Sequence, residues 1–202
     1  MLVKICGVTT KEGRDAVVEA GADFIGFVFA ESRRRISPDE AAEIAAGIPQ
    51  SVKKVGVFVN ESPEKIIAIA EKVNLDYIQL HGDEQSEIAE ELPYKIIKAF
   101  PAKKENLEQM RTFPCDYLLV DTPSETLRGG SGETFDWSLL DGEGIKREKL
   151  ILAGGLTPEN VTDAIRAVKP AIVDVSSGVE TLGKKDPNKI KKFIETAKGM
   201  RG

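Results

Sequence analysis

The chain alternates between short apolar runs and longer amphipathic segments. Eight of the apolar runs have the length of strands and are bounded by turn residues. They cover residues 2–6, 23–29, 55–59, 77–80, 95–100, 117–121, 150–153 and 171–175. Because strands that are buried on both faces read as continuous apolar runs, this pattern predicts eight strands of a parallel sheet.

The segments between these runs show the spacing of helices. Apolar residues recur every three or four positions at residues 41–48, 66–73, 161–168 and 190–197, which predicts one apolar stripe on each helix. Four helix starts pair an N-cap residue with a following proline: Ser37–Pro38, Ser62–Pro63, Thr157–Pro158 and Asp186–Pro187. Glu40 completes a capping box on Ser37. The pattern is weakest at residues 105–112 and 135–140, where we expect short helices.

Two architectures fit this alternation of strands and helices. An open doubly wound sheet usually carries a glycine-rich first turn for a dinucleotide, but "CGVTTKEGR" after the first run is not GxGxxG. A closed (β/α)8 barrel needs eight apolar strands, and 202 residues leave about 25 for each unit. We therefore predict a TIM barrel that forms a single α/β domain over residues 1–202.

The overall charge and the cysteine content narrow the possible functions. A formal net charge of −5 gives no electrostatic footprint for nucleic acid or an anionic membrane. There is no signal-peptide pattern and no apolar run of transmembrane length, so we expect a cytoplasmic protein without a membrane partner. Two cysteines and one histidine make neither a disulfide framework nor a metal motif.

Polar residues and glycines stand where the predicted strands end. Active sites of (β/α)8 barrels lie at the carboxyl ends of the strands, so these positions are the candidate site. They are Cys6, Arg33 to Arg35, Asn60, His81, Asp121, Gly154, Gly155, Ser176, Ser177 and Gly178. The glycine-containing turns after the last two strands predict a phosphate cradle of backbone N–H groups formed by Gly154, Gly155, Ser177 and Gly178.

Seven motifs in order along the chain carry a family resemblance. They are "KICGVT", "GFVF" followed by "SRRRIS", "VGVFVN", "QLHGDE", "DTPSETLRGGSGETFDW", "AGGLTPENV" and "VDVSSGVE" with the later "GKKD". From residue 3 to about residue 198 the chain resembles phosphoribosylanthranilate isomerase of tryptophan biosynthesis. The resemblance implies a (β/α)8 barrel that converts N-(5-phosphoribosyl)anthranilate into 1-(2-carboxyphenylamino)-1-deoxyribulose 5-phosphate, an Amadori rearrangement, without a metal or an organic cofactor.

The resemblance also implies roles for three side chains. Cys6 would be the general base that takes the C2 proton, and Asp121 the general acid that protonates the ring oxygen. We expect the pKa of the thiol to be lowered, or the thiol to ionise transiently, and the pKa of the carboxyl to be raised by burial. Arg34 would bind the anthranilate carboxylate, but the pattern alone does not choose among the three consecutive arginines.

Three further features have a less definite reading. His81 has no primary role in the family and is a possible secondary residue of the site. Cys115 precedes its strand and reads as a packing residue. The glycine-rich segment from Thr122 to Thr134 reads either as a lid over the substrate or as a flexible connection.

Two alternatives to the isomerase remain at this point. One is another phosphosugar barrel enzyme: an epimerase would require two histidines with acidic metal ligands, and an indole-glycerol-phosphate synthase would require catalytic lysines at strand ends. The other is a non-catalytic barrel that binds a phosphoribosyl ligand, against which the presence of both Cys6 and Asp121 argues. The sequence does not determine the oligomeric state.

Closure of the barrel has a consequence for two charged residues. It places the first strand beside the eighth, and the two-residue period of a strand puts Lys4 on the inward face with Cys6, and Asp174 on the inward face with Ser176. Because two buried opposite charges are stable only when they are paired, we predict a salt bridge between Lys4 and Asp174 inside the barrel.

Overall fold

The computed structural model describes residues 1–121 and 146–199. Its eight parallel strands form a closed ring in chain order. They are β1 (Leu2–Cys6), β2 (Phe24–Val28), β3 (Lys53–Phe58), β4 (Tyr77–Leu80), β5 (Lys95–Pro101), β6 (Tyr117–Asp121), β7 (Leu150–Ala153) and β8 (Ile172–Val175). All eight predicted strands are present within two residues of their expected ends, and the (β/α)8 barrel is confirmed.

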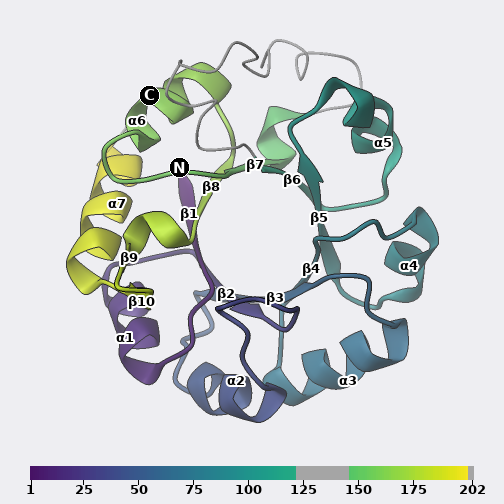
Figure 1. Cartoon of the computed structure of the whole chain (residues 1–202), viewed down its shortest axis with the longest axis horizontal. Coiled ribbons are helices and arrows are strands. Elements are labelled where there is room, and N and C mark those ends of the chain that lie inside the picture. Colours follow the sequence, from purple (N-terminus) through teal and green to yellow (C-terminus); the bar gives the residue numbers. More distant parts are fainter. Residues whose placement is uncertain (122–145, 200–202) are drawn as a thin grey trace.

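Helices surround the ring of strands on the outside (Figure 1). They are α1 (Lys11–Glu19), α2 (Pro38–Ala45), α3 (Pro63–Val73), α4 (Ser86–Glu91), α5 (Leu107–Thr112), α6 (Val161–Val168) and α7 (Pro187–Gly199). Single 3₁₀ turns lie at Lys104–Asn106 (η1), Arg147–Lys149 (η4) and Ser177–Val179 (η5). A short antiparallel hairpin of β9 (Glu180–Thr181) and β10 (Lys184–Lys185) follows η5. In the described residues no helix is both long and apolar enough to cross a membrane.

The helix starts follow the predicted capping residues with one exception. Ser37 and Glu40 form the capping box of α2, Ser62 caps α3, and Asp186 Oδ1 accepts from the N–H groups of Asn188 and Lys189 at the start of α7. The predicted start at Thr157 is wrong, because α6 begins at Val161.

A separate turn explains this late start of α6. Asn160 Oδ1 accepts from the N–H of Thr157 at 2.7 Å, and Asn160 Nδ2 donates to the Gly155 carbonyl at 2.9 Å. Residues 157–160 are therefore tied back to the glycine turn that follows β7, and the helix begins only after them.

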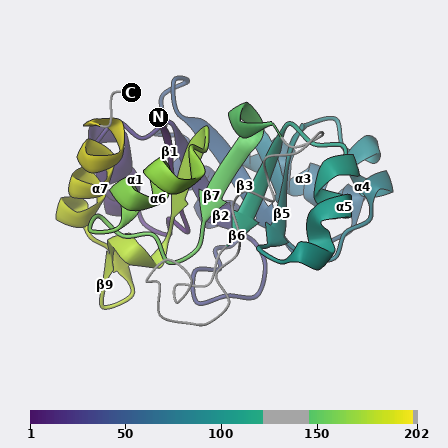
Figure 2. The ribbon, with the colours of Figure 1, turned by 90° about the horizontal axis from the view of Figure 1, so that it is seen from above.

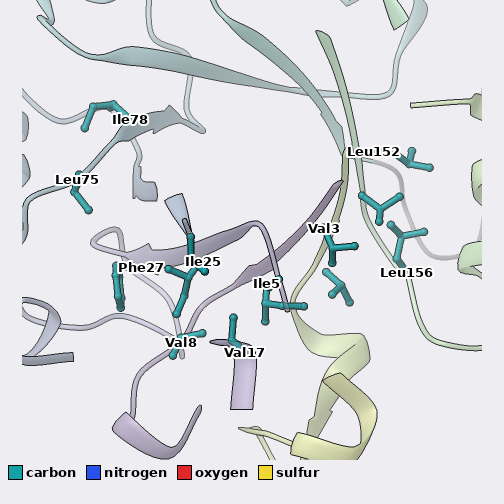
Figure 3. Close-up of a cluster of buried hydrophobic side chains, with 14 of the residues drawn as sticks. Val3, Ile5, Val8, Val17, Ile25, Phe27, Leu75, Ile78, Leu152 and Leu156 are labelled. Atoms are coloured by element: carbon teal, nitrogen blue, oxygen red, sulfur yellow. The ribbon is translucent and has the colours of Figure 1, made fainter. Parts of the chain in front are cut away.

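Two apolar layers hold the barrel together. Outward side chains of the strands, such as Ile5 and Phe27, pack against helix residues such as Val17 of α1 (Figure 3). Inward side chains fill the interior, where the ring of Phe24 meets that of Tyr77 edge to face at 5.6 Å between centroids. Figure 2 shows the same strands from the side, with helices at both ends of the view.

The predicted salt bridge inside the barrel is confirmed. Lys4 and Asp174 are partners in the β1–β8 register, and Lys4 Nζ lies 3.0 Å from Asp174 Oδ2. The Lys4 side chain is fully buried, and that of Asp174 is 7% exposed. This pair lies one layer below Cys6, so it forms part of the floor of the barrel mouth.

Candidate active site

A cavity of about 400 Å³ opens at the carboxyl ends of the strands. Eight of the candidate residues were given a role in the site, and seven of these line the cavity: Cys6, Arg34, His81, Asp121, Gly154, Gly155 and Ser177. Gly178 is the eighth. It lies behind Ser177, where a side chain would overlap the Leu156 carbonyl, so its missing Cβ lets the loops after β7 and β8 approach closely.

Cys6 is surrounded by buried charges. A Cβ added to Gly26 on the neighbouring strand would lie 2.9 Å from Cys6 Sγ and 3.3 Å from Lys4 Nζ, so the thiol and the ammonium share the space above this glycine. Burial raises the pKa of the Cys6 thiol, and the ammonium groups of Lys4 and Lys185 oppose that rise without cancelling it. The expected lowering of this pKa is therefore wrong, because desolvation outweighs the two positive charges.

The β9–β10 hairpin ties the Cys6 region to Arg34. Lys185 Nζ donates to Glu180 Oε1 at 2.7 Å and to the Ser176 carbonyl at 3.0 Å, and Ser176 Oγ donates to the Cys6 carbonyl. Arg34 Nε and Nη2 hold the two oxygens of Glu180 at 2.7 and 2.8 Å. Glu180 thus bridges two cations. Burial by itself would raise the pKa of Glu180, but these two partners lower it.

The structure distinguishes the three consecutive arginines. Arg34 lines the cavity, and its aliphatic stem lies over Gly7, where a Cβ would overlap it. Arg33 and Arg35 are exposed, and Arg35 pairs with Glu31 on the surface at 3.0 Å. Among these arginines, only Arg34 can therefore present its guanidinium to a ligand in the cavity.

Asp121 lies at the end of β6 in more open surroundings. Its side chain is 44% exposed, so the burial expected for the general acid is not found. His81 Nε2 lies 3.6 Å from Asp121 Oδ2. The buried amide of Gln79 donates from Nε2 to His81 Nδ1 at 2.8 Å, which leaves the proton of a neutral His81 on Nε2, facing Asp121.

The glycine turn after β7 adopts a conformation that favours glycine. Gly154 has φ 90° and Gly155 has φ 58°, both in the left-handed region. Gly155 is anchored by the Asn160 amide, and Ser177 begins the 3₁₀ turn η5 beside it in the cavity wall. These residues form one wall of the cavity.

Sequence reasoning missed four residues at the site. Gln79 and Asp174 line the cavity, and Glu180 and Lys185 hold Arg34 and the Cys6 segment. The motifs "QLHGDE", "VDVSSGVE" and "GKKD" contain all four, but only Asp174 was given a partner. The inward face of β4 could have identified Gln79, because it lies two residues beyond the interior residue Tyr77.

Two of the predicted features, the possible lid from Thr122 to Thr134 and the short helix at 135–140, lie outside the described residues. Within residues 1–121 and 146–199, no three His, Cys, Asp or Glu side chains are grouped so that they could hold a metal ion.

Comparisons with known proteins match nearly the whole chain. The model of the family "N-(5'phosphoribosyl)anthranilate (PRA) isomerase" matches residues 3–196. The N-(5'-phosphoribosyl)anthranilate isomerase of Listeria monocytogenes serovar 1/2a is 51% identical over 99% of this chain and 100% of its own length. That of Oceanobacillus iheyensis is 53% identical over 96% of this chain and 95% of its own length.

Solved structures agree with these sequence matches. Phosphoribosyl anthranilate isomerase from Thermotoga maritima superimposes with a TM-score of 0.86 at 46% identity, covering 99% of this chain and all of that one. A phosphoribosyl anthranilate isomerase in complex with reduced 1-(o-carboxyphenylamino)-1-deoxyribulose 5-phosphate gives 0.84 at 44% identity, with the same coverage. By the family model, by its relatives and by its fold, the chain belongs to the N-(5'-phosphoribosyl)anthranilate isomerase family.

Proposed function

We propose that this chain catalyses the Amadori rearrangement of its family by general acid–base catalysis, with Cys6 as the base and Asp121 as the acid. The substrate is N-(5-phosphoribosyl)anthranilate, and the product is 1-(2-carboxyphenylamino)-1-deoxyribulose 5-phosphate. The observation that carries the proposal is that Cys6, Asp121, Arg34 and the glycine wall line one cavity. A related isomerase was solved with the reduced product, which has the same carboxylate and phosphate ends.

The ring-opening step needs an acid. Asp121 donates its proton to the ring oxygen while the bond from C1 to that oxygen breaks, and the nitrogen lone pair forms a C1=N iminium. Asp121 is suited to this role because it reaches the cavity from β6 while its half-exposed side chain stays open to proton exchange with water. His81 supplies a second donor near its carboxylate.

The second step needs a base near C2. The Cys6 thiolate takes the C2 proton, and the electron pair of that bond forms C1=C2 and neutralises the iminium, giving an enolamine that tautomerises to the ketone. Because burial raises the pKa of Cys6, the thiol is ionised only transiently at neutral pH. The buried ammonium groups of Lys4 and Lys185 stabilise the thiolate when it forms.

The two ends of the substrate fit two parts of the cavity. Arg34 would bind the anthranilate carboxylate through N–H groups that Glu180 leaves available, since a guanidinium has five donors and Glu180 engages Nε and Nη2. The phosphate would bind backbone N–H groups of the wall formed by Gly154, Gly155 and Ser177, close to Gly178. A single domain over residues 1–202 and a cytoplasmic location remain predictions.

The test follows the loss of fluorescence of freshly generated phosphoribosylanthranilate. Cys6→Ser and Asp121→Asn each keep the shape of the side chain and should lower kcat by about 10²- to 10⁴-fold while KM changes little. Cys115→Ser and Asp163→Asn are the matched controls, because Cys115 lies outside the mouth cavity and Asp163 is 84% exposed on α6. A Cys6→Ser enzyme with more than about a third of parental activity would exclude the base role. A parent without turnover would favour the non-catalytic binding barrel.

A further inference from the structure

Two buried acceptor atoms in the barrel mouth have no hydrogen-bond partner within residues 1–121 and 146–199. Among the residues that the structure describes, Gln79 Oε1 and Asp174 Oδ1 are the buried side-chain polar atoms in this state. Both residues line the mouth cavity, and they are 1% and 7% exposed. Buried polar groups are nearly always paired, so each of these two atoms requires a partner from outside the described part of the chain.

The other polar atoms of the same two side chains are already engaged. Gln79 Nε2 donates to His81 Nδ1 at 2.8 Å, and Asp174 Oδ2 accepts from Lys4 Nζ at 3.0 Å. These bonds fix the orientation of each group. The amide and the carboxylate are therefore held in place with one acceptor left over on each.

The fold places Gln79 and Asp174 on opposite walls of one space. Tyr77 of β4 and Ile172 of β8 belong to the interior core, and the two-residue period puts Gln79 and Asp174 on the same inward face, one layer nearer the mouth. In a closed ring of eight strands, β4 and β8 lie across from each other. A ligand seated in the mouth thus passes between Gln79 and Asp174.

The chemistry of the missing partner follows from the acceptors. A carboxylate oxygen and an amide oxygen can accept hydrogen bonds only from N–H or O–H groups. The carboxylate and the phosphate at the two ends of the proposed substrate supply acceptors at neutral pH, whereas its middle carries hydroxyl donors. The two atoms therefore match the middle of the substrate.

We propose that Asp174 binds the C2 hydroxyl and Gln79 the C3 hydroxyl of the substrate, an inference that rests on the proposed function. Asp174 pairs with Lys4, which shares the space above Gly26 with the Cys6 thiol, and C2 is the carbon from which Cys6 takes a proton. Gln79 holds His81 beside Asp121, and C3 is the neighbour of the carbon that carries the ring oxygen. The two bonds hold the reacting carbons between base and acid.

Calorimetric titration tests this proposal without turnover. The probes are reduced 1-(o-carboxyphenylamino)-1-deoxyribulose 5-phosphate and three counterparts that lack the hydroxyl at C2, C3 or C4. For the parent, loss of the C2 or the C3 hydroxyl should weaken binding by about 10-fold or more, because a buried acceptor is left unpaired. Loss of the C4 hydroxyl should cost less than either.

Variants assign each hydroxyl to its residue. Gln79→Met should bind the complete probe and the probe without the C3 hydroxyl with affinities that agree within about twofold. The loss of affinity on removal of the C4 hydroxyl should be the same as in the parent. Gln79→Glu is the matched control: it keeps an acceptor but no donor to His81, so it should still discriminate at C3. The double variant Lys4→Met/Asp174→Leu removes the pair without leaving a lone buried charge and should become insensitive to the C2 hydroxyl.

The outcomes separate this inference from the proposed function. A Gln79→Met enzyme that loses as much affinity as the parent on removal of the C3 hydroxyl would overturn the assignment. If a variant does not fold, the measurements on the parent still test the assignment. Affinity losses below about twofold for both the probe without the C2 hydroxyl and the probe without the C3 hydroxyl would also overturn it. A parent that turns over substrate and binds the complete probe would leave the proposed function intact in either case, whereas a parent that does neither would overturn both.

Discussion

Cys6 and Asp121 line the same cavity, but the walls around them differ in charge and in exposure. On the β1–β8 side, Lys4 and Lys185 are 0% and 4% exposed and each is paired with a carboxylate. On the β4–β6 side, His81 and Asp121 are 35% and 44% exposed, and their side chains approach only to 3.6 Å. Beside the partly buried Cys6 thiol lies a network of buried ion pairs, whereas Asp121 and His81 are open to water.

This difference matches the difference in the proposed chemistry. A thiolate that takes a proton from carbon must form close to compensating charge, and the buried, paired ammonium groups of Lys4 and Lys185 provide it without reorganisation. A carboxyl group that is consumed as an acid in every cycle must regain its proton, and exposure to water allows this. The two proposed proton-transfer groups are therefore supported in opposite ways within one cavity.

The largest expected effect comes from breaking the buried ion pair of Lys4 and Asp174 beside Cys6. Lys4→Met leaves the Asp174 carboxylate buried without a partner, so we expect a loss of about 3–5 kcal/mol in the free energy of unfolding, measured by urea denaturation. Lys4→Met/Asp174→Leu should recover most of that loss. If the free energy of unfolding of Lys4→Met lies within about 0.5 kcal/mol of that of the parent, the ion pair does not make the Cys6 side more rigidly built than the Asp121 side.

The second prediction concerns the cavity wall formed by Gly154, Gly155 and Ser177. Gly155→Pro is incompatible with φ 58°, so it should displace the turn after β7 and raise KM by about 10-fold or more if this backbone binds the phosphate. Lys184→Ala is the control, because this exposed lysine lies on the hairpin outside the mouth cavity and should change KM by less than about twofold. A large effect of Lys184→Ala together with a silent Gly155→Pro would refute the backbone cradle.

The pH dependence of kcat/KM tests the ionisation of Cys6. In the proposed mechanism Cys6 acts in its deprotonated form, and burial raises its pKa, so the thiolate fraction rises as the pH approaches that pKa from below. In the parent this rise is opposed, because the proposed general acid acts in its protonated form. Asp121→Asn removes the acid, so the residual kcat/KM of this variant should increase by up to about tenfold per pH unit between about pH 7 and about pH 9 if proton abstraction limits its rate. A profile of Asp121→Asn that is flat over this range would contradict the transient thiolate.

The smallest effect is expected on the open side. His81→Asn keeps an acceptor, Oδ1, for the Gln79 amide and removes the long contact with Asp121. Such contacts between partly exposed groups contribute little to stability. The free energy of unfolding should therefore change by less than about 1 kcal/mol in the same denaturation experiment. A loss comparable to that of Lys4→Met would show that the two sides are equally integrated into the fold.

The sequence was sufficient to predict the strands and the helices that carry a strong apolar stripe. Buried strands and helices such as α3 and α6 have apolar patterns that reflect the surface they bury. Helices α1 and α4 bury few residues, Gly13 and Val17 in the first and Ala89 in the second, so their apolar spacing was too weak to identify them. The predicted start of α6 was wrong because Asn160 bonds back to Thr157 and Gly155, and the resulting turn replaces the predicted cap.

Local pattern alone was enough to predict the order of the strands and the inward faces of β1 and β8. It also predicted the buried pair of Lys4 and Asp174, because a period of two residues and closure of the ring bring these two charges together. The three-dimensional arrangement was needed to show which arginine faces the cavity, how Glu180 and Lys185 reach it from the hairpin, and in which direction the pKa of Cys6 moves. Those properties depend on burial and on charges brought together from distant segments, and neither is written in local spacing.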